Sequence, residues 1–302
     1  MIISIFELVP YGVTLGFSVG ILTGYFGAGG GFILTPVLNI LLGIPMNVAV
    51  GTSACQVLGA SSFSLWHQQD KRWQGIRVAA WMGAGIPAGV WLGSNLVQCL
   101  KARGSMALAC RSVPIVDVSL LAVFAIFLSL ITLWLFLDNF ILRRGRDDES
   151  ERMKGYLAVL SFPPMIHFRT VPHGPFSGPV LVLLGLVTGC LSGLMGIGGG
   201  VILMPILFYL VGQEIKAAAR TSTMLVFMAG LCATLVHAYD GNINWVLAAC
   251  LIGGAFFGTR LGIRLQHNTP GKRIRQYFTF VVLAAALIVI GKLIVLGLPH
   301  GS

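Results

Sequence analysis

The chain has very few charged residues for its length. Only 10% of its 302 residues are Asp, Glu, Lys or Arg, whereas 56% are hydrophobic, and the mean hydropathy is +0.87. A soluble globule cannot bury so large an apolar fraction, so the composition excludes that class. Carboxylates are also scarce, and all ten lie at the ends of apolar runs or in loops. Because a cation or proton relay normally uses an acid within the membrane, cation transport coupled to a buried acid is disfavoured.

Signatures of several other chemistries are missing. The six cysteines show no C-x-x-C spacing and lie mostly in apolar runs, which predicts small buried side chains rather than disulfides or a metal site. No G-x-G-x-x-G nucleotide-binding pattern and no H-E-x-x-H occurs. Gly59-Ala60-Ser61 could present a nucleophile, but no histidine is placed to pair with it. We therefore predict no catalytic residue, no metal and no cofactor.

Long apolar runs are what the sequence has instead. They extend over about 11–44, 46–66, 75–98, 113–142, 179–212, 217–238, 244–265 and 275–298. Their length and their internal Gly and Pro predict membrane helices rather than barrel strands. The net charge of +10 would suggest nucleic acid in a soluble protein, but here the basic residues lie mostly between the runs. We predict an all-α polytopic membrane protein whose partner is the lipid bilayer and not nucleic acid.

One glycine-rich phrase occurs twice. Residues 24–31 read G-Y-F-G-A-G-G-G and residues 193–200 read G-L-M-G-I-G-G-G, and each is followed by a proline five residues later. At this offset of 169 residues, further glycines coincide, and Thr52-Ser53 meets Thr221-Ser222. The chain is therefore a duplicated unit, which in a membrane protein indicates a transporter with a site where the copies meet.

Basic residues predict how the two copies are oriented. The first run of each copy, 11–44 and 179–212, is too long for one span and short for two, so it is either one broken helix or a hairpin that returns to its own side. If it returns, the second copy is inverted, and all but four of the 20 Lys and Arg residues fall on one side. The four are Lys101, Arg103, Arg111 and Lys292. If each run crosses instead, the two sides carry nearly equal numbers.

The positive-inside rule therefore favours two inverted repeats, each a glycine-broken helical hairpin followed by three transmembrane helices. Residues 1–142 form the first repeat, 143–178 a linker and 179–302 the second repeat. The linker is charged at its start and proline-rich at its end, as expected of a surface connector. We expect the linker in the cytoplasm and both termini outside.

The glycine phrases are the first candidate binding residues: Gly29, Gly30 and Gly31 in one copy, and Gly198, Gly199 and Gly200 in the other. Each is expected to begin a half-helix near the middle of the bilayer, whose first amides lack partners and whose dipole is positive. Such ends suit a small oxyanion. The alternative is that these glycines only allow close helix packing.

Hydroxyls and titratable groups add further candidates. Thr52-Ser53 and Thr221-Ser222 could donate to an anion or could bond their own helix backbone. Arg220 has no counterpart in the first copy, and it either attracts anions or is an orientation charge. His67 and His237 correspond with a one-residue slip, so they are either interfacial caps or titratable gates.

These residues carry a family resemblance. The doubled G-x-G-G-G-x-x-x-x-P phrase and the Ala-x-x-Thr-Ser that follows it, at 49–53 and 218–222, are similar to those of the sulfite exporter TauE/SafE family. The resemblance covers about 11–98 and 181–265. It implies a permease that moves sulfite, sulfoacetate, thiosulfate or another small sulfur or carboxylate anion across the bacterial cytoplasmic (inner) membrane.

We therefore predict an anion transporter, an exporter by the family's name, that works by alternating access and is not an enzyme. Leucine at Gly30 or Gly199 is expected to abolish transport while leaving folded protein. The different-class alternative is a non-transport membrane protein, either an assembly factor or an intramembrane enzyme, that uses the same pocket. The sequence leaves the anion, the direction, proton coupling and the oligomeric state open.

Overall fold

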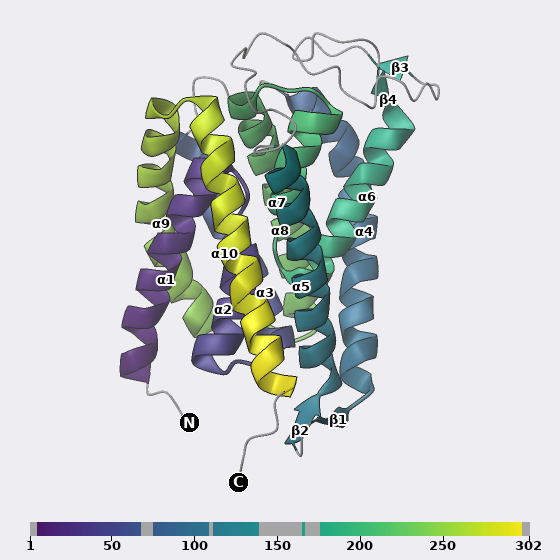
Figure 1. Ribbon diagram of the computed structural model, residues 1–302, viewed down its shortest axis with the longest axis vertical. Coiled ribbons are helices and arrows are strands. Elements are labelled where there is room, and N and C mark those ends of the chain that lie inside the picture. The colour runs from purple at the N-terminus through teal and green to yellow at the C-terminus, as the bar shows by residue number, and fades with distance from the viewer. Residues whose placement is uncertain (1–4, 68–74, 109–110, 139–164, 167–175, 298–302) are drawn as a thin grey trace.

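A computed structural model describes residues 5–67, 75–108, 111–138, 165–166 and 176–297, and it is almost entirely helical (Figure 1). The first copy contains α1 (Ile5–Phe26), α2 (Gly31–Leu42), α3 (Met46–His67), α4 (Ile76–Ala102), the hairpin of β1 (Ser105–Leu108) and β2 (Arg111–Pro114), and α5 (Ile115–Phe136). The second contains α6 (Gly178–Met195), α7 (Gly200–Pro205), the π-helical turn η4 (Ile206–Leu210), α8 (Ile215–Tyr239), α9 (Trp245–Asn268) and α10 (Gly271–Gly297). Two short paired strands, β3 (Met165–Ile166) and β4 (Phe176–Ser177), precede α6.

The predicted polytopic all-α class is confirmed. In the described part of the chain, seven helices are long and apolar enough to cross a membrane, namely α1, α3, α5, α6, α8, α9 and α10. The predicted run 75–98 also forms a helix, α4, whose 27 residues span about 40 Å at 1.5 Å per residue. Most of the 143–178 linker lies outside the described residues.

The glycine phrases do break the first run of each copy. Residues 11–44 form α1 and α2, and 179–212 form α6 followed by α7 and η4. The 12 residues of α2 extend only about 18 Å, well short of a 30 Å hydrocarbon core. A helix this short suits the hairpin interpretation of these runs, in which α2 does not cross the bilayer by itself, and the hairpin stays a prediction.

Equivalent helices of the two copies run in opposite directions (Figure 1). α5 rises from the end where β1 and β2 lie, whereas its counterpart α10 descends towards that same end. The start of α1 and the end of α10 lie at this end, and β3 and β4 lie at the opposite one. Lys216, at the start of α8, donates to the carbonyl of His267, near the end of α9, which ties two segments of the β3–β4 end together.

Rows of glycine let the first helix of each copy pack closely against the fourth helix of the other. Glycines 16, 20 and 24 on α1 face glycines 254, 258 and 262 on α9, and glycines 85, 89 and 93 on α4 face glycines 185, 189 and 193 on α6. A methyl group at Gly16 would contact the backbone of Leu251, and one at Gly185 would contact the equivalent backbone of Met82. Small residues let helix backbones approach this closely in membranes. Each copy's first helix thus packs on the other copy's fourth.

Further contacts pair helices with their own counterparts, with the most buried pair at the centre and apolar side chains outside. α3 packs against α8, and α5 against α10. Large side chains on the outer surface are apolar, as at Trp91, Leu183 and Phe257. A soluble protein rarely exposes so much apolar surface, and lipid is the solvent that fits it.

Candidate functional site at the glycine breaks

The first glycine break needs residues without side chains. Gly27, Gly29 and Gly30 all have positive φ, where a Cβ atom is strained. Gly30 is the N-cap of α2 at φ 65° and ψ −9°, and its carbonyl accepts from Ile33 and Leu34 at 3.2 and 3.3 Å. The amides of Gly31 and Phe32 come before these two donors in the chain, and they have no carbonyl within the helix to donate to, as at any helix start. These amides are the donors that the sequence analysis predicts to bind an anion.

The second break repeats this conformation with a shorter helix after it. Gly196, Gly198 and Gly199 have positive φ, and Gly199 caps α7 at φ 71° and ψ −4°. Its carbonyl accepts from residues 202 and 203 at 3.1 and 3.0 Å. After six residues the α-helix widens into the π-helical turn η4. The dipole at this break is therefore that of a shorter regular helix than α2.

The two breaks lie against each other, so the copies do meet at the glycine phrases. A methyl group on Gly31 would lie 2.5 Å from the carbonyl oxygen of Gly196 and 2.8 Å from Cα of Ile197. A methyl group on Gly200 would collide with the carbonyl of Ala28. All six predicted glycines are buried. Their contacts show close packing, which is the alternative explanation of the phrase, and the role of these glycines in binding an anion stays a prediction.

A symmetric pair of valines covers the breaks. Val57 on α3 and Val226 on α8 are equivalent at the 169-residue offset. A Cβ on Gly29 would be 2.7 Å from Val226 and 3.1 Å from Val57, and one on Gly198 would be 2.7 Å from Val57 and 3.0 Å from Val226. The breaks are therefore closed in this conformation by side chains of both central helices.

The threonines of the two Thr-Ser pairs face the other copy's fourth helix. The hydroxyl of Thr52 accepts from the amide of Asn244, the N-cap of α9, at 3.1 Å. Thr221 donates to the carbonyl of Ala217 at 3.1 Å and packs against Gly75, the N-cap of α4. In this conformation the threonines hold helix ends and their own backbone, and their substrate role stays a prediction.

The serines differ between the copies. Ser222 donates to the carbonyl of Gly27 at 2.9 Å, which joins α8 directly to the first break. Ser53 is equivalent to Ser222 and is also fully buried, yet its hydroxyl has no hydrogen-bond partner. Val50, one turn before Ser53, lies against Gly196 in the second break. At the two glycine breaks, therefore, the hydroxyl of Ser222 has a hydrogen-bond partner and that of Ser53 has none.

The three lower-ranked candidates lie in different surroundings. His237 is fully buried in the last turn of α8, and its Nε2 lies 3.0 Å from the carbonyl oxygen of Gly193 near the end of α6. His67 is half-buried, and its Nδ1 lies 2.8 Å from the carbonyl oxygen of Phe63 in its own helix. Arg220 is half-buried in the second turn of α8. Their gating or attracting roles stay predictions.

Sequence reasoning missed Gln56. Its side chain is fully buried, and neither its Nε2 nor its Oε1 has a hydrogen-bond partner. It follows Thr52 by four residues and directly precedes Val57, but its counterpart in the second copy is Leu225. A search for matched polar positions passes over such a residue. The signal that could have found it is a lone amide inside an apolar run.

A second polar group joins the copies at the end of α4. Lys101, at the end of α4, donates to Oδ1 of Asn242 at 3.3 Å, and Nδ2 of Asn47 donates to the same oxygen at 3.0 Å. This contact gives Lys101 a structural role, although it lies on the side with few basic residues. Cys99 on the same helix is exposed, so the prediction of buried cysteines is wrong at that position.

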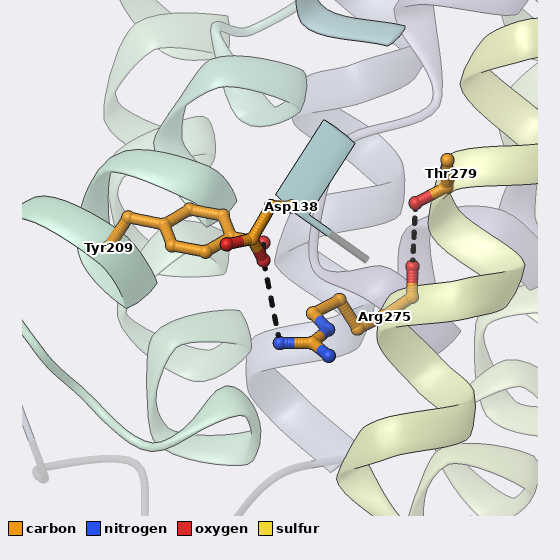
Figure 2. Close-up of polar contacts among 4 residues, drawn as sticks. All are labelled: Asp138, Tyr209, Arg275 and Thr279. Carbon is orange, nitrogen blue, oxygen red and sulfur yellow. Dashed lines mark hydrogen bonds and ion pairs between the residues drawn. The ribbon is translucent and has the colours of Figure 1, made fainter. Parts of the chain in front are cut away.

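A third polar group lies at the opposite end (Figure 2). Asp138, just beyond α5, accepts a 2.6 Å hydrogen bond from the hydroxyl of Tyr209 in η4. Nη1 of Arg275 on α10 is 3.6 Å from the same carboxylate oxygen, and Thr279 donates to the carbonyl of Arg275 at 3.1 Å. The group links α5 of the first copy to η4 and α10 of the second.

Neither of the two surface recesses found among the described residues lies at the breaks. A cavity of about 350 Å³ lies between α1, α9 and α10, and its lining includes Tyr25, Leu265 and Tyr277. None of the predicted site residues lines it. It is an apolar recess on the outer surface and offers an anion no cluster of donors.

Comparison with known proteins identifies the family. The family described as "Sulfite exporter TauE/SafE" matches residues 11–289, which is nearly the whole chain. The protein belongs to this family. The matched range includes both glycine breaks and the helices that pack around them.

Individual members of the TauE/SafE family carry transporter names. A "Probable membrane transporter protein" of Xylella fastidiosa (strain Temecula1) is 26% identical over 96% of each chain, and "Probable membrane transporter protein MJ0441" of Methanocaldococcus jannaschii is 28% identical over 96% of each. "Probable membrane transporter protein YunE" of Bacillus subtilis is 31% identical over 36% of this chain and 40% of its own. No solved structure matches the chain.

Proposed function

We propose that the protein moves a small sulfur-containing oxyanion, such as sulfite, sulfoacetate or thiosulfate, across the bacterial inner membrane by alternating access. The observation that carries the proposal is the meeting of the two glycine breaks at the centre of the molecule. The family and the names of its members support transport rather than enzymatic catalysis. That the substrate is a small anion is our inference from the chemistry of the breaks, and the sulfur-containing class is proposed from the family's description.

Backbone amides suit this substrate class. The start of α2 presents donors and a positive dipole end, and the closest neighbours of the break glycines are uncharged residues such as Val57 and Thr23. A site of this kind binds an anion without a fully charged partner, so binding need not be strong enough to prevent release. We propose that amides after Gly29 and Gly198 hold the anion and that the Thr-Ser pairs complete the site.

Inverted repeats supply a way to alternate access. The exchanged helices and the opposite directions of equivalent elements support two copies inverted across the membrane (Figure 1). The closed breaks then correspond to an occluded state, in which neither side reaches the site. Movement of one copy against the other opens it first to one side and then to the other.

Charge supports one orientation of this assembly. The end of the molecule that holds Lys216, Lys272 and Arg273 is rich in basic residues, which supports placing that end and the linker in the cytoplasm. Both termini are then outside. The direction of flux depends on the substrate gradient across the membrane. Direction and proton coupling are therefore measured in the same assay that identifies the substrate.

Uptake into proteoliposomes tests the proposal. Purified protein is assayed with labelled sulfite, thiosulfate, sulfoacetate, sulfate and acetate, with and without a pH gradient, against protein-free vesicles. Saturable uptake of one sulfur oxyanion is expected, and its dependence on the gradient reports proton coupling. Binding of an anion without flux would instead favour the non-transport alternative, and no flux of any anion by folded protein would refute the proposal.

A further inference from the structure

The two halves of the doubled site are chemically unequal. In the second copy Ser222 is hydrogen-bonded and Leu225 is apolar, whereas the equivalent residues of the first copy, Ser53 and Gln56, are polar and unpartnered. Each of these four side chains is fully buried. A buried amide that is left unsatisfied is costly, more so where lipid replaces water. A leucine at the equivalent place shows that the repeat does not need an amide there to fold.

Gln56 lies at the level where α2 begins. Val57 is the next residue, and its Cγ2 would be 3.0 Å from a Cβ on Gly31, the first residue of α2. Ala49, seven residues before Gln56 and so on the same helix face, packs in one cluster with Leu34 and Leu38 of α2. Gln56 is therefore on the face of α3 that follows α2 up to its N-terminus.

Ser53 extends the same polar face. It precedes Gln56 by three residues, which places the two side chains next to each other on the helix. With the first amides of α2, they provide donors from a serine hydroxyl, a carboxamide and the backbone. Only Oε1 of Gln56 is a pure acceptor among these side-chain atoms, and a fully deprotonated oxyanion has nothing to donate to it.

We propose that Gln56 is a specificity-determining residue, and that with Ser53 and the start of α2 it selects a small anion that carries a hydrogen-bond donor. The donor is a protonated oxygen or a hydroxyl group, which satisfies Oε1 while Nε2 and the amides bind the anionic oxygens. This inference rests on the proposed function and names the substrate class of the same site. It assigns the preference to the first copy alone.

Matched pairs of anions test this preference. Acetate and glycolate differ by one hydroxyl, as do methanesulfonate and hydroxymethanesulfonate. Each is titrated against purified protein in nanodiscs, and affinity is read from the rise in unfolding temperature. The wild type is expected to bind the hydroxyl-bearing member of a pair about three- to tenfold more tightly, the value of one net hydrogen bond. In Gln56→Leu both members of a pair are expected to bind more weakly, because the Nε2 donor is lost, and the preference between them is expected to vanish.

Stability without an anion gives a second readout. Gln56→Leu should unfold at the same temperature as the wild type or higher, because the residue taken from the second copy removes an unsatisfied amide. Gln56→Met serves if packing of the branched side chain fails, and Leu225→Met controls for altered packing at the equivalent position. A Gln56→Leu protein that keeps the preference, or a wild type that binds anions without any preference, overturns the inference alone. A wild type that neither binds nor transports any anion overturns the proposed function as well.

Discussion

Alanine substitutions at three glycines separate backbone strain from packing at the breaks. Gly43, Gly199 and Gly30 have nearly the same φ, at 63°, 71° and 65°. A Cβ at Gly43 meets nothing within 4 Å, and at Gly199 its nearest atom is the Thr188 carbonyl oxygen at 3.1 Å. At Gly30 it collides with a methyl group of Val19 and lies 3.0 Å from the Val19 carbonyl oxygen.

The expected losses of unfolding free energy follow from these contacts. Positive φ costs an alanine about 1–2 kcal/mol, so this is the whole cost at Gly43. Forcing a methyl group into a packed site adds about 1–3 kcal/mol, which brings Gly30→Ala to about 2–5 kcal/mol. Gly199→Ala should fall between the two, because its neighbour needs to move only slightly.

Reversible denaturant titration of the purified variants measures these differences. The expected order of destabilisation is Gly43→Ala, then Gly199→Ala, then Gly30→Ala. If Gly30→Ala were no more destabilised than Gly43→Ala, the close packing of the first break against α1 would be refuted. The same contacts make Gly199 the better position for a leucine, since a leucine at Gly30 endangers folding as well as transport.

Three further predictions concern the rest of the molecule. Ser222→Ala should lose about 1 kcal/mol of unfolding free energy with its hydrogen bond, whereas Ser53→Ala should lose none, because that hydroxyl is unpartnered; equal losses in denaturant titration would contradict this. Tyr209→Phe should cost about 1.5–3 kcal/mol, since its 2.6 Å bond is to a carboxylate, and an unchanged unfolding free energy would argue against this link between the copies. Cysteines at the exposed positions Arg103 and Arg273 should be labelled by an impermeant reagent from opposite sides of the membrane, and labelling from one side would refute the inverted orientation.

The sequence predicted the breaks because their cause is local. A run of glycines allows the positive φ that the breaks adopt, and its recurrence after 169 residues showed that the feature is built twice. The length of the run 11–44 left a broken helix and a hairpin open, since 34 residues suit neither one span nor two, and the distribution of basic residues favoured the hairpin. These inferences depend on neighbouring residues, on the positions of charges and on the thickness of a bilayer.

The exchange of helices depends on tertiary packing, so sequence alone did not predict it. Glycines at every fourth position of α1 and α9 indicate a packing face but do not name the partner. The same limit applies to Thr52, whose hydroxyl accepts from Asn244 of the other copy. Gln56 was missed for a different reason: the site was sought by symmetry, and its informative feature is a departure from symmetry.

Flux through a pair of leucine variants tests the central claim, that the anion is held at the glycine breaks. Gly199→Leu alters the second break, whereas Gly43→Leu places the same residue at a similar φ in open space at the end of α2. Both are reconstituted beside the wild type and assayed for uptake of the anion that the wild type transports, after gel filtration shows folded protein. The account predicts that Gly199→Leu loses uptake and Gly43→Leu keeps it. Normal uptake by folded Gly199→Leu would contradict it.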